Sequence, residues 1–479
     1  LVVVVKRKRK EKMGLKVIVV GGGIAGLSAA IALRRAGHEV HVYERSAFAN
    51  EVGAAIHIPP NASRPLLGWG LDTVGAKFVM VRRSYRANGV TLDKFNEMGH
   101  GSLQDTYGAP WFFAHRVDLH EELRRLATQE AETGGGGMPV QIHLGSEVVE
   151  FLPESSSIRL VGGQIISGDL VIAADGIHTN AAKLVLGHDN PPLPQKDYNY
   201  CYRFLIPAAD IQSDPATRDW LDGDDGRMKF FVGHDMKRLV SYPCRNFPYS
   251  VISNEEHNFV AMFHNNDEAA NNPEDWQASV DKSELLKRYD DFHPYLKAIM
   301  NKATVVKQWA LLYRPPLPTW RKGALILIGD AAHPNAAPGA NHPILPTLEA
   351  TADVQYPPPL DQGQGGAQSI EDGVALGILL SGAATAEEVV SRLELFESLR
   401  RNRCSAIQIL SNAGQDEADR VRDAASKFLP IEDIPASTED FVDFLFGYDV
   451  VKEAIAIMRQ READFTLPPG FFQSPALMN

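Results

Sequence analysis

The chain has 479 residues, of which 44% are hydrophobic and 23% charged, a composition typical of globular proteins with two or three domains. Its formal net charge of −12 argues against a nucleic-acid binder held by phosphate contacts. The three cysteines stand far apart and form no CxxC pair, which excludes a disulfide framework and fits a reducing, cytoplasmic location. No apolar run approaches the ~18–20 residues that span a bilayer, so we expect no membrane span.

The first twelve residues differ from the rest of the chain. They read LVVVVKRKRKEK, an apolar run followed by a basic run, which reverses the order of a secretory signal. Met13 stands just before the first strand-like pattern. We interpret residues 1–12 as a non-native or disordered extension, with a targeting segment as the alternative.

A βαβ unit is predicted directly after this segment. Residues 17–20 and 40–43 are short apolar runs typical of buried strands, and residues 24–35 between them have a helical composition. The turn between the first strand and the helix reads GGGIAG, which has GxGxxG spacing. Its first glycine permits a tight turn, its second admits a pyrophosphate, and its last allows close packing of helix and strand.

Glu44 ends the second strand, at the place where a carboxylate binds ribose hydroxyls. An acidic residue there disfavours a ribose 2′-phosphate, so the pattern predicts NAD or FAD rather than NADP. A glycine-rich turn without a ligand is the alternative. The predicted cofactor contacts in this unit are Gly21, Gly23, Ala25, Gly26 and Glu44.

Two later buried strands also run into acidic turns. Asp175-Gly176 follows residues 169–174, and Gly329-Asp330 follows residues 324–328. Acidic residues at the carboxyl ends of parallel strands lie where α/β sheets bind ligands. Each turn alone is more often structural, because Asp-Gly is a common turn sequence. The three motifs in this order are far more specific and indicate FAD.

These motifs resemble a known family. The segments GGGIAGLSAA, YERS, AHRVDLHEEL, VIAADGIHT and LIGDAAHP, followed by GQGGAQSIEDG, are similar to the class A FAD-dependent aromatic hydroxylases, in particular the salicylate hydroxylase-like branch with its many fungal enzymes. The resemblance covers about residues 13–410. It implies bound FAD, reduction by NAD(P)H, reaction with O₂ to a C4a-hydroperoxyflavin, and transfer of one oxygen to an aromatic ring.

The resemblance also implies roles for individual residues. Glu44 would bind the adenosine ribose and Arg116 the flavin side of FAD. Asp330 would contact the ribityl chain and the pyrophosphate, and Asp175 would help to place FAD and NAD(P)H. A turn at residues 364–366, which contains Gly366, would precede a helix that begins near residue 368 and points its N-terminus at the flavin.

The sequence departs from the family pattern in two places. After Asp175-Gly176 the family usually has Ser and then Arg, but Thr179 and Ala182 stand here, with Lys183 adjacent. Residues 340–361 form a proline-rich insert that we interpret as a gene-model artefact or retained intron, with a functional loop as the alternative. We expect that deleting this insert keeps the fold and raises flavin occupancy or hydroxylation.

Substrate contacts are predicted on a sheet formed by residues 200–264, where strand-like pieces alternate with turns. Arg203 is a candidate ligand for a phenolate or carboxylate, and Tyr242 is a candidate substrate contact. His57 would line the flavin or act as a base. Simple packing is the alternative for all three. His333 is expected to shape the flavin loop, the aromatic run at residues 111–113 lines a pocket or the core, and no metal site is expected.

The predicted fold is α/β, with a Rossmann-like FAD-binding domain, an antiparallel-sheet substrate domain and a helical C-terminal region. The expected ranges are 13–190 and 301–395 for the FAD-binding domain, 191–300 for the sheet layer and 396–479 for the helices. The predicted function is hydroxylation of a small phenolic or aromatic acid by a monomer or homodimer, with or without decarboxylation. The alternatives are a flavin-binding protein inactivated by the insert, and a flavin oxidase or dehydrogenase.

Overall fold

A computed structural model describes most of the chain. The described residues are 14–48, 55–130, 136–192, 198–223, 225–235, 237–246, 254–265, 279–311, 314–334, 364–412 and 418–473. The predicted N-terminal extension (1–12) and the predicted insert (340–361) both lie outside these ranges.

A six-stranded sheet forms one half of the molecule. Its order is β19 (Arg321–Lys322), β20 (Leu325–Leu327), β12 (Leu170–Ala173), β1 (Lys16–Val20), β2 (Glu39–Tyr43) and β8 (Gln141–His143). Neighbouring strands from β20 to β8 pair in parallel. The apolar strands β1, β12 and β20 are buried because helices and a small sheet cover both faces. The strands predicted for this half, at residues 17–20, 40–43, 169–174 and 324–328, are all present.

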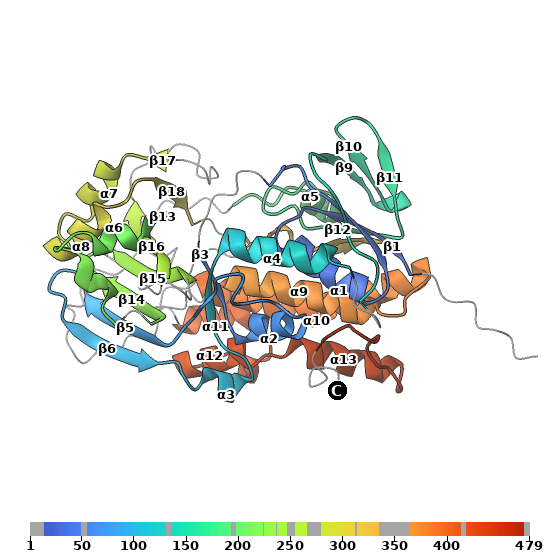
Figure 1. Ribbon diagram of the computed structural model, residues 1–479. Coiled ribbons are helices and arrows are strands. Elements are labelled where there is room, and N and C mark those ends of the chain that lie inside the picture. Colours follow the sequence, from blue (N-terminus) through green and yellow to red (C-terminus); the bar gives the residue numbers. More distant parts are fainter. Residues whose placement is uncertain are drawn as a thin grey trace, which may run out of the picture.

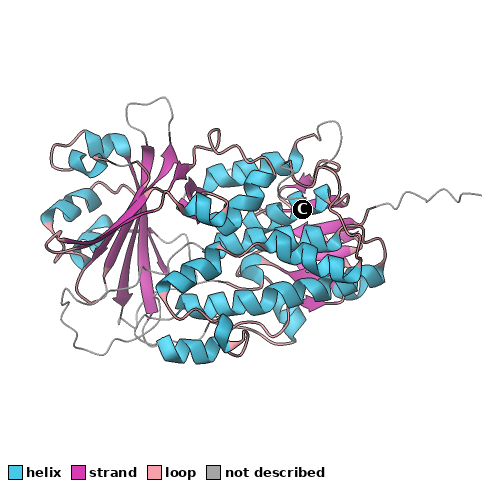
Figure 2. Ribbon diagram, turned by 90° about the horizontal axis from the view of Figure 1, so that it is seen from below, coloured by secondary structure: helices cyan, strands magenta, loops and turns pink. Residues whose placement is uncertain are grey.

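Helices cover this sheet and separate it from the second half. Helix α1 (Ile24–Arg35) connects β1 to β2 and packs closely on α9 (Gln364–Leu380), because Gly373 and Gly377 have no Cβ to collide with Ser28 and Ala32. Helix α4 (Arg116–Thr128) lies beside them in Figure 1. Figure 2 shows the helices as a layer between the two large sheets. The layer also contains α2 (Pro60–Gly68), α10 (Ala386–Asn412), α11 (Ala418–Ala425), α12 (Thr438–Phe446) and α13 (Val450–Arg461).

The second half is built on an eight-stranded sheet. Its order is β17 (Ser279–Val280), β18 (Val306–Ala310), β13 (Tyr198–Pro207), β16 (Asn254–Asn265), β15 (Arg238–Asn246), β14 (Arg227–Val232), β5 (Arg83–Asn88) and β6 (Lys94–Gly99). The central strands β13, β16, β15 and β14 pair antiparallel, as predicted. Strands β5 and β6 come from an earlier part of the chain, and β5 pairs with β14 in parallel.

The two faces of this sheet bury different clusters. On β13, Tyr202 and Phe204 point to a cluster that α6 (Ala208–Gln212), α7 (Lys282–Arg288) and α8 (Pro294–Met300) cover. The alternate residue Cys201 points the other way, into a cluster shared with α10, α12 and the small sheet β3 (Ala55–Ile58), β7 (Phe112–His115) and β4 (Val79–Met80). This second cluster lies between the two halves of the molecule.

The remaining elements are peripheral. Strands β9 (Val148–Leu152), β10 (Ser157–Leu160) and β11 (Ile165–Ser167) form a three-stranded sheet beside α5 (Ala181–Leu186), and α3 (Leu103–Tyr107) lies near α12 in Figure 1. Among the described residues, none of the helices has the length and hydropathy needed to cross a membrane.

Candidate functional site

The glycine-rich turn has the geometry of a dinucleotide site. Gly21 has a φ of +99°, and a Cβ there would lie 2.4 Å from the Ala174 carbonyl oxygen. A Cβ on Gly26 would lie 2.0 Å from the Gly21 carbonyl oxygen, so helix α1 and the turn can approach only with glycine. Around Gly23, by contrast, a Cβ would meet nothing within 4 Å. This open space faces the N-terminus of α1, where free N–H groups and the helix dipole favour a pyrophosphate.

Glu44 is held beside this turn. One carboxylate oxygen accepts a 2.7 Å hydrogen bond from the Gly22 backbone N–H, and the other accepts one of 2.7 Å from Ser46. Each oxygen keeps a second lone pair, which leaves capacity for ribose hydroxyls. Ala25 is buried, and it packs against Gly329 at the start of the short 3₁₀ turn η3 (Gly329–Ala331).

Loss of the Glu44 carboxylate is expected to weaken FAD binding. We predict that Glu44→Ala raises the dissociation constant about tenfold or more, because a charged hydrogen bond contributes about 1.5–3 kcal/mol. The measurement is fluorescence titration of released FAD. Glu39→Ala, which removes the exposed carboxylate that pairs with His41 at the start of the same strand, is the control. Equal affinity in Glu44→Ala and Glu39→Ala would exclude Glu44 as a ribose ligand.

Two further acidic residues lie at the carboxyl edge of the same sheet. Burial raises the pKa of Asp175 to about 6, although a hydrogen bond from Thr179 opposes the shift. Asp330 lines a cavity, and desolvation by the surrounding protein raises the pKa of its carboxyl group. His333 and Arg116 act against this shift, which places the exposed Arg116 within electrostatic reach of Asp330.

The cavity next to Asp330 has a volume of about 310 Å³. Lys183 lies on its wall together with Thr179 and Ala182, the positions at which the sequence departs from the family pattern. Lys183 pairs with Asp189 at 3.1 Å, and both side chains are exposed. Lys183 therefore supplies a cation at this edge of the sheet, although Ala182 stands where the family usually has an arginine.

The start of α9 differs from the prediction. The helix begins at Gln364, so the turn predicted for residues 364–366 is wrong and Gly366 lies in the first helical turn. A Cβ on Gly366 would lie 2.5 Å from the Ile56 side chain, so the glycine lets β3 approach the helix. Ala367, Gln368 and Glu371, which follow the glycines, are good helix formers, and the glycine run obscured this signal in the sequence.

The face of the eight-stranded sheet that looks toward β3 gathers the predicted substrate residues. Tyr242 stacks on Phe113 at 4.6 Å between ring centroids, and His57 meets Tyr242 edge-on at 4.5 Å. Arg203 donates a 3.0 Å hydrogen bond from Nη2 to the Ala55 carbonyl oxygen, which ties β13 to β3. Trp111 also belongs to this group, and its ring centroid lies 5.6 Å from that of His57. The structure thus brings Arg203, Tyr242 and His57 together.

His57 is neutral in this environment. Burial, together with the positive charge of Arg203, lowers its pKa to about 3. A group with this pKa is a very weak base at neutral pH, so its contribution is a hydrogen bond rather than proton removal. Because Ile56 points to α9, its neighbour His57 points to the opposite side, toward Tyr242.

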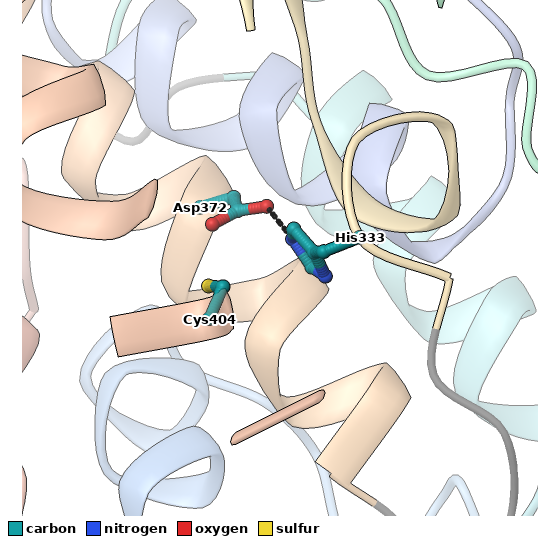
Figure 3. Close-up of side chains that lie close together, drawn as sticks. All are labelled: His333, Asp372 and Cys404. Carbon is teal, nitrogen blue, oxygen red and sulfur yellow. Dashed lines mark hydrogen bonds and ion pairs between the residues drawn. The ribbon is translucent and has the colours of Figure 1, made fainter. Parts of the chain in front are cut away.

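His333 belongs to a buried group of side chains with Asp372 and Cys404 (Figure 3). Its Nε2 lies 2.7 Å from an Asp372 oxygen that also accepts a hydrogen bond from the Gly329 N–H. Burial alone would lower the pKa of His333, but Cys404 and Asp372 raise it well above its usual value. Arg400 donates to both Asp372 and Cys404. The Arg400 guanidinium already pairs with the Asp372 carboxylate, which disfavours a metal ion there.

The sequence reasoning missed Asp372, Glu371 and Arg400, which connect the turn at Gly329 to α9 and α10. Asp372 bonds to Gly329, and Arg400 bonds to both carboxylates. The IED motif was a usable signal, since two adjacent acids in a buried helix need a cationic partner. No sequence signal identified Arg400 as that partner.

Comparisons with known proteins agree with this geometry. Residues 19–55 match the NAD(P)-binding Rossmann-like domain family. An FAD-dependent monooxygenase of Aspergillus candidus is 40% identical over 466 residues, covering 96% of this chain and 99% of the relative. Hispidin-3-hydroxylase of Neonothopanus nambi is 30% identical, covering 93% and 96%. A salicylate hydroxylase substrate complex has the same fold, with a TM-score of 0.65 at 21% identity, covering 93% of this chain and 98% of that one.

The chain belongs to the FAD-dependent monooxygenases, which confirms the predicted family, and its cofactor is FAD. The open space at Gly23, the oriented Glu44 and the cavity beside Asp330 fit this cofactor. The roles of the individual residues are developed below as proposals.

Proposed function

We propose that this monooxygenase uses NAD(P)H and O₂ to hydroxylate a small phenolic or aromatic-acid substrate between the eight-stranded sheet and β3. The observation that carries this proposal is the position of Arg203, a cation within electrostatic reach of His57, whose ring meets that of Tyr242. A planar aromatic anion matches such a surface, because its ring packs on the apolar residues and its oxygen meets the guanidinium.

Arg203 would stabilise the substrate as an anion. A phenolate is a stronger nucleophile than a phenol, and a nearby fixed charge lowers the pKa of the substrate hydroxyl. The hydrogen bond from Nη2 to Ala55 fixes the guanidinium, so less conformational freedom is lost when the substrate binds. If the reacting carbon carries a carboxylate, the same residue would bind it, and hydroxylation would proceed with decarboxylation.

Tyr242 and His57 would orient the ring. Tyr242 stacks on Phe113, which holds the phenol side chain in place. The neutral His57 offers ring nitrogens that can exchange hydrogen bonds with a substrate hydroxyl without adding charge. Their burial among aromatic rings excludes water from the reacting centre. When bound, FAD supplies electron transfer from NAD(P)H and activation of O₂, and the protein supplies orientation and charge.

The test is turnover of the purified FAD-loaded protein with a panel of phenolic acids. We expect substrate-stimulated NAD(P)H oxidation and a product that carries one oxygen atom from ¹⁸O₂. One relative is named hispidin-3-hydroxylase, which supports this reaction type. Hispidin is therefore included among the compounds tested. Hydrogen peroxide without any labelled organic product would favour the oxidase or uncoupled-flavoprotein alternatives.

Arg203→Lys is expected to lower hydroxylation more than it lowers FAD content. Lysine keeps the positive charge but loses the planar fork, so we predict a rise in KM of about tenfold or more. Steady-state kinetics with the accepted substrate and the flavin absorbance of the same sample provide the two measurements. Lys307→Arg, at the neighbouring position on β18, is a matched control. Unchanged KM in Arg203→Lys would remove Arg203 from the substrate site.

A further inference from the structure

Two buried amide side chains end at the N-terminus of α9 with unused hydrogen-bonding atoms. Asn61, on α2, is 1% exposed, and Gln364, the first residue of α9, is 5% exposed. Within the described parts of the chain, Asn61 Oδ1 and Gln364 Nε2 have no hydrogen-bond partner. A buried amide atom without a partner is costly, so these two atoms call for a ligand.

Arg400 sets the orientation of Asn61. The fully buried guanidinium pairs with the Glu371 carboxylate, which is therefore an acceptor only. Asn61 must turn its NH₂ toward that carboxylate, and its Nδ2 lies 2.5 Å from Glu371 Oε1. The Asn61 carbonyl oxygen is consequently directed away from the ion pair and remains available as an acceptor.

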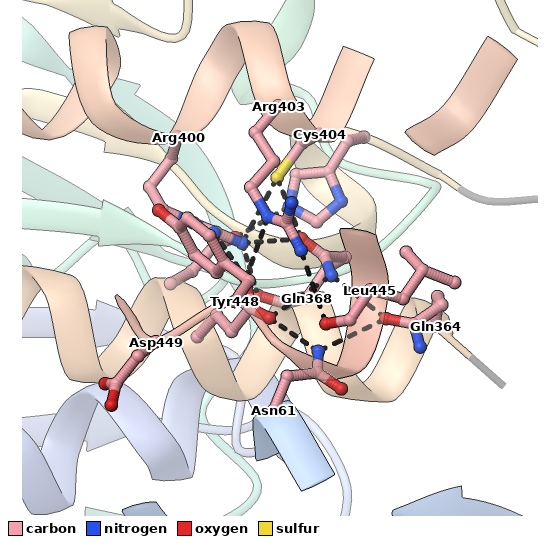
Figure 4. Close-up of polar contacts among 12 residues, drawn as sticks. Asn61, Gln364, Gln368, Arg400, Arg403, Cys404, Leu445, Tyr448 and Asp449 are labelled. Carbon is pink, nitrogen blue, oxygen red and sulfur yellow. Dashed lines mark hydrogen bonds and ion pairs between the residues drawn. The ribbon is translucent and has the colours of Figure 1, made fainter. Parts of the chain in front are cut away.

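Arg400 also sets the orientation of Gln364, through Gln368. Arg400 Nη2 donates to Gln368 Oε1 at 2.7 Å, which leaves the NH₂ of Gln368 to donate to Gln364 Oε1 at 3.1 Å. Asn61 Nδ2 donates to the same oxygen at 3.3 Å. With its oxygen occupied twice, Gln364 presents its NH₂. Figure 4 shows the Asn61 oxygen and the Gln364 nitrogen turned to the same side, away from Arg400.

The position of this pair is continuous with the dinucleotide site. The Gly329 N–H bonds to Asp372 on α9, so the turn that carries Asp330 is fixed to the same helix. On the other side, Ile56 of β3 touches Gly366 in the first turn of α9. An extended dinucleotide that starts at Glu44 and passes Asp330 would therefore reach the amide pair before it meets β3 and the substrate face.

We propose that Asn61 and Gln364 bind the imide edge of the FAD isoalloxazine ring, with N3–H donating to Asn61 Oδ1 and Gln364 Nε2 donating to an adjacent ring carbonyl. The imide edge has one N–H donor between two carbonyl acceptors. It therefore complements the Asn61 oxygen, which accepts, and the neighbouring Gln364 nitrogen, which donates. The first-turn N–H groups of α9 add further donors for ring oxygens. This inference depends on FAD binding alone and is independent of the proposed substrate.

The test uses FAD and FAD methylated at N3, which has no N3–H. Bound FAD in the holoenzyme is exchanged against each free flavin, and the ratio of their affinities is measured from the released FAD. We expect the wild-type protein to bind the methylated flavin at least about tenfold more weakly than FAD, because the donor to Asn61 is lost. A ratio close to one in the wild-type protein would overturn the proposal.

Variants separate the two amides. Asn61→Ala should weaken FAD binding about tenfold and bring the affinity ratio close to one, whereas Gln364→Met should weaken both flavins equally and keep the ratio. Ser381→Ala is the control, because this buried hydroxyl just beyond the other end of α9 donates to the Gly377 carbonyl oxygen, and its loss should leave both affinities unchanged.

Two outcomes of the variant experiment would contradict the proposal. An unchanged ratio in a folded Asn61→Ala protein would mean that another group receives N3–H, and unchanged FAD affinity in Gln364→Met would remove the second contact. Melting curves establish folding. If Asn61→Ala does not fold, the wild-type ratio and Gln364→Met still decide the question.

Discussion

Arg400→Met is expected to lower the free energy of unfolding by about 3–5 kcal/mol, the typical cost of removing one partner from a buried ion pair. Arg400, Glu371 and Asp372 are all fully buried, and Arg400 donates to both carboxylates. Without the guanidinium, Glu371 and Asp372 are two neighbouring negative charges in a low-dielectric interior. Thermal melting of the FAD-loaded variant and wild-type proteins measures the effect, together with flavin retention.

Two further variants distinguish charge from packing. Arg461→Met removes an exposed arginine whose Nη1 donates to Ser391, and it should change stability by less than about 0.5 kcal/mol. The triple variant Arg400→Met, Glu371→Gln, Asp372→Asn removes the charges together and should recover much of the loss. If Arg400→Met melts within a degree of the wild-type protein, the buried pair does not stabilise the fold.

The protein is expected to lose stability as the pH falls below 6.5, with His57 contributing about 2–3 kcal/mol of the loss at pH 4.5. Burial lowers the pKa of His57 to about 3 in the folded state, whereas an unfolded histidine titrates near 6.5. Between these values the unfolded state binds one more proton, so acid favours unfolding. The contribution of neutral His57 to the free energy of unfolding is therefore complete above pH 6.5. It is lost progressively as the pH falls toward 3.

Denaturation at pH 7.5 and pH 4.5 measures this dependence. His57→Gln keeps a polar side chain but does not titrate, so its stability should fall less between the two pH values than that of the wild-type protein. His188→Gln, at an exposed position, should leave the wild-type dependence unchanged. Burial also lowers the pKa of His38 and His100 to about 4, so some acid sensitivity remains in every variant. Identical pH dependence in His57→Gln and wild type would show that His57 is not buried and neutral.

Local sequence was sufficient for the nucleotide-binding half. Helix α1, the strands on either side of it, and the strands that lead to Asp175 and Asp330 lie where the patterns predicted them. The reason is that each signal is local: a buried parallel strand needs a continuous apolar run, and a turn with positive φ at Gly21 needs glycine. The family motifs were needed to identify FAD as the cofactor, because a glycine-rich turn alone does not distinguish FAD from NAD.

The tertiary structure decided which distant groups meet. Nothing local indicates that strands β5 and β6 extend the second sheet, since pairing depends on which edge is left free after the chain has folded. Which side His57 faces depends on the contact between Ile56 and Gly366, whose residues are far apart in the sequence.

The clearest example is the ion pair that orients the amides at α9. The Glu371 carboxylate receives Arg400 from α10 and Asn61 from α2. The sequence alone determined that two adjacent acids, Glu371 and Asp372, stand in an apolar helix. Only the packing of three helices determined their partners, because a buried charge selects whichever cation and amide the fold brings within hydrogen-bonding distance.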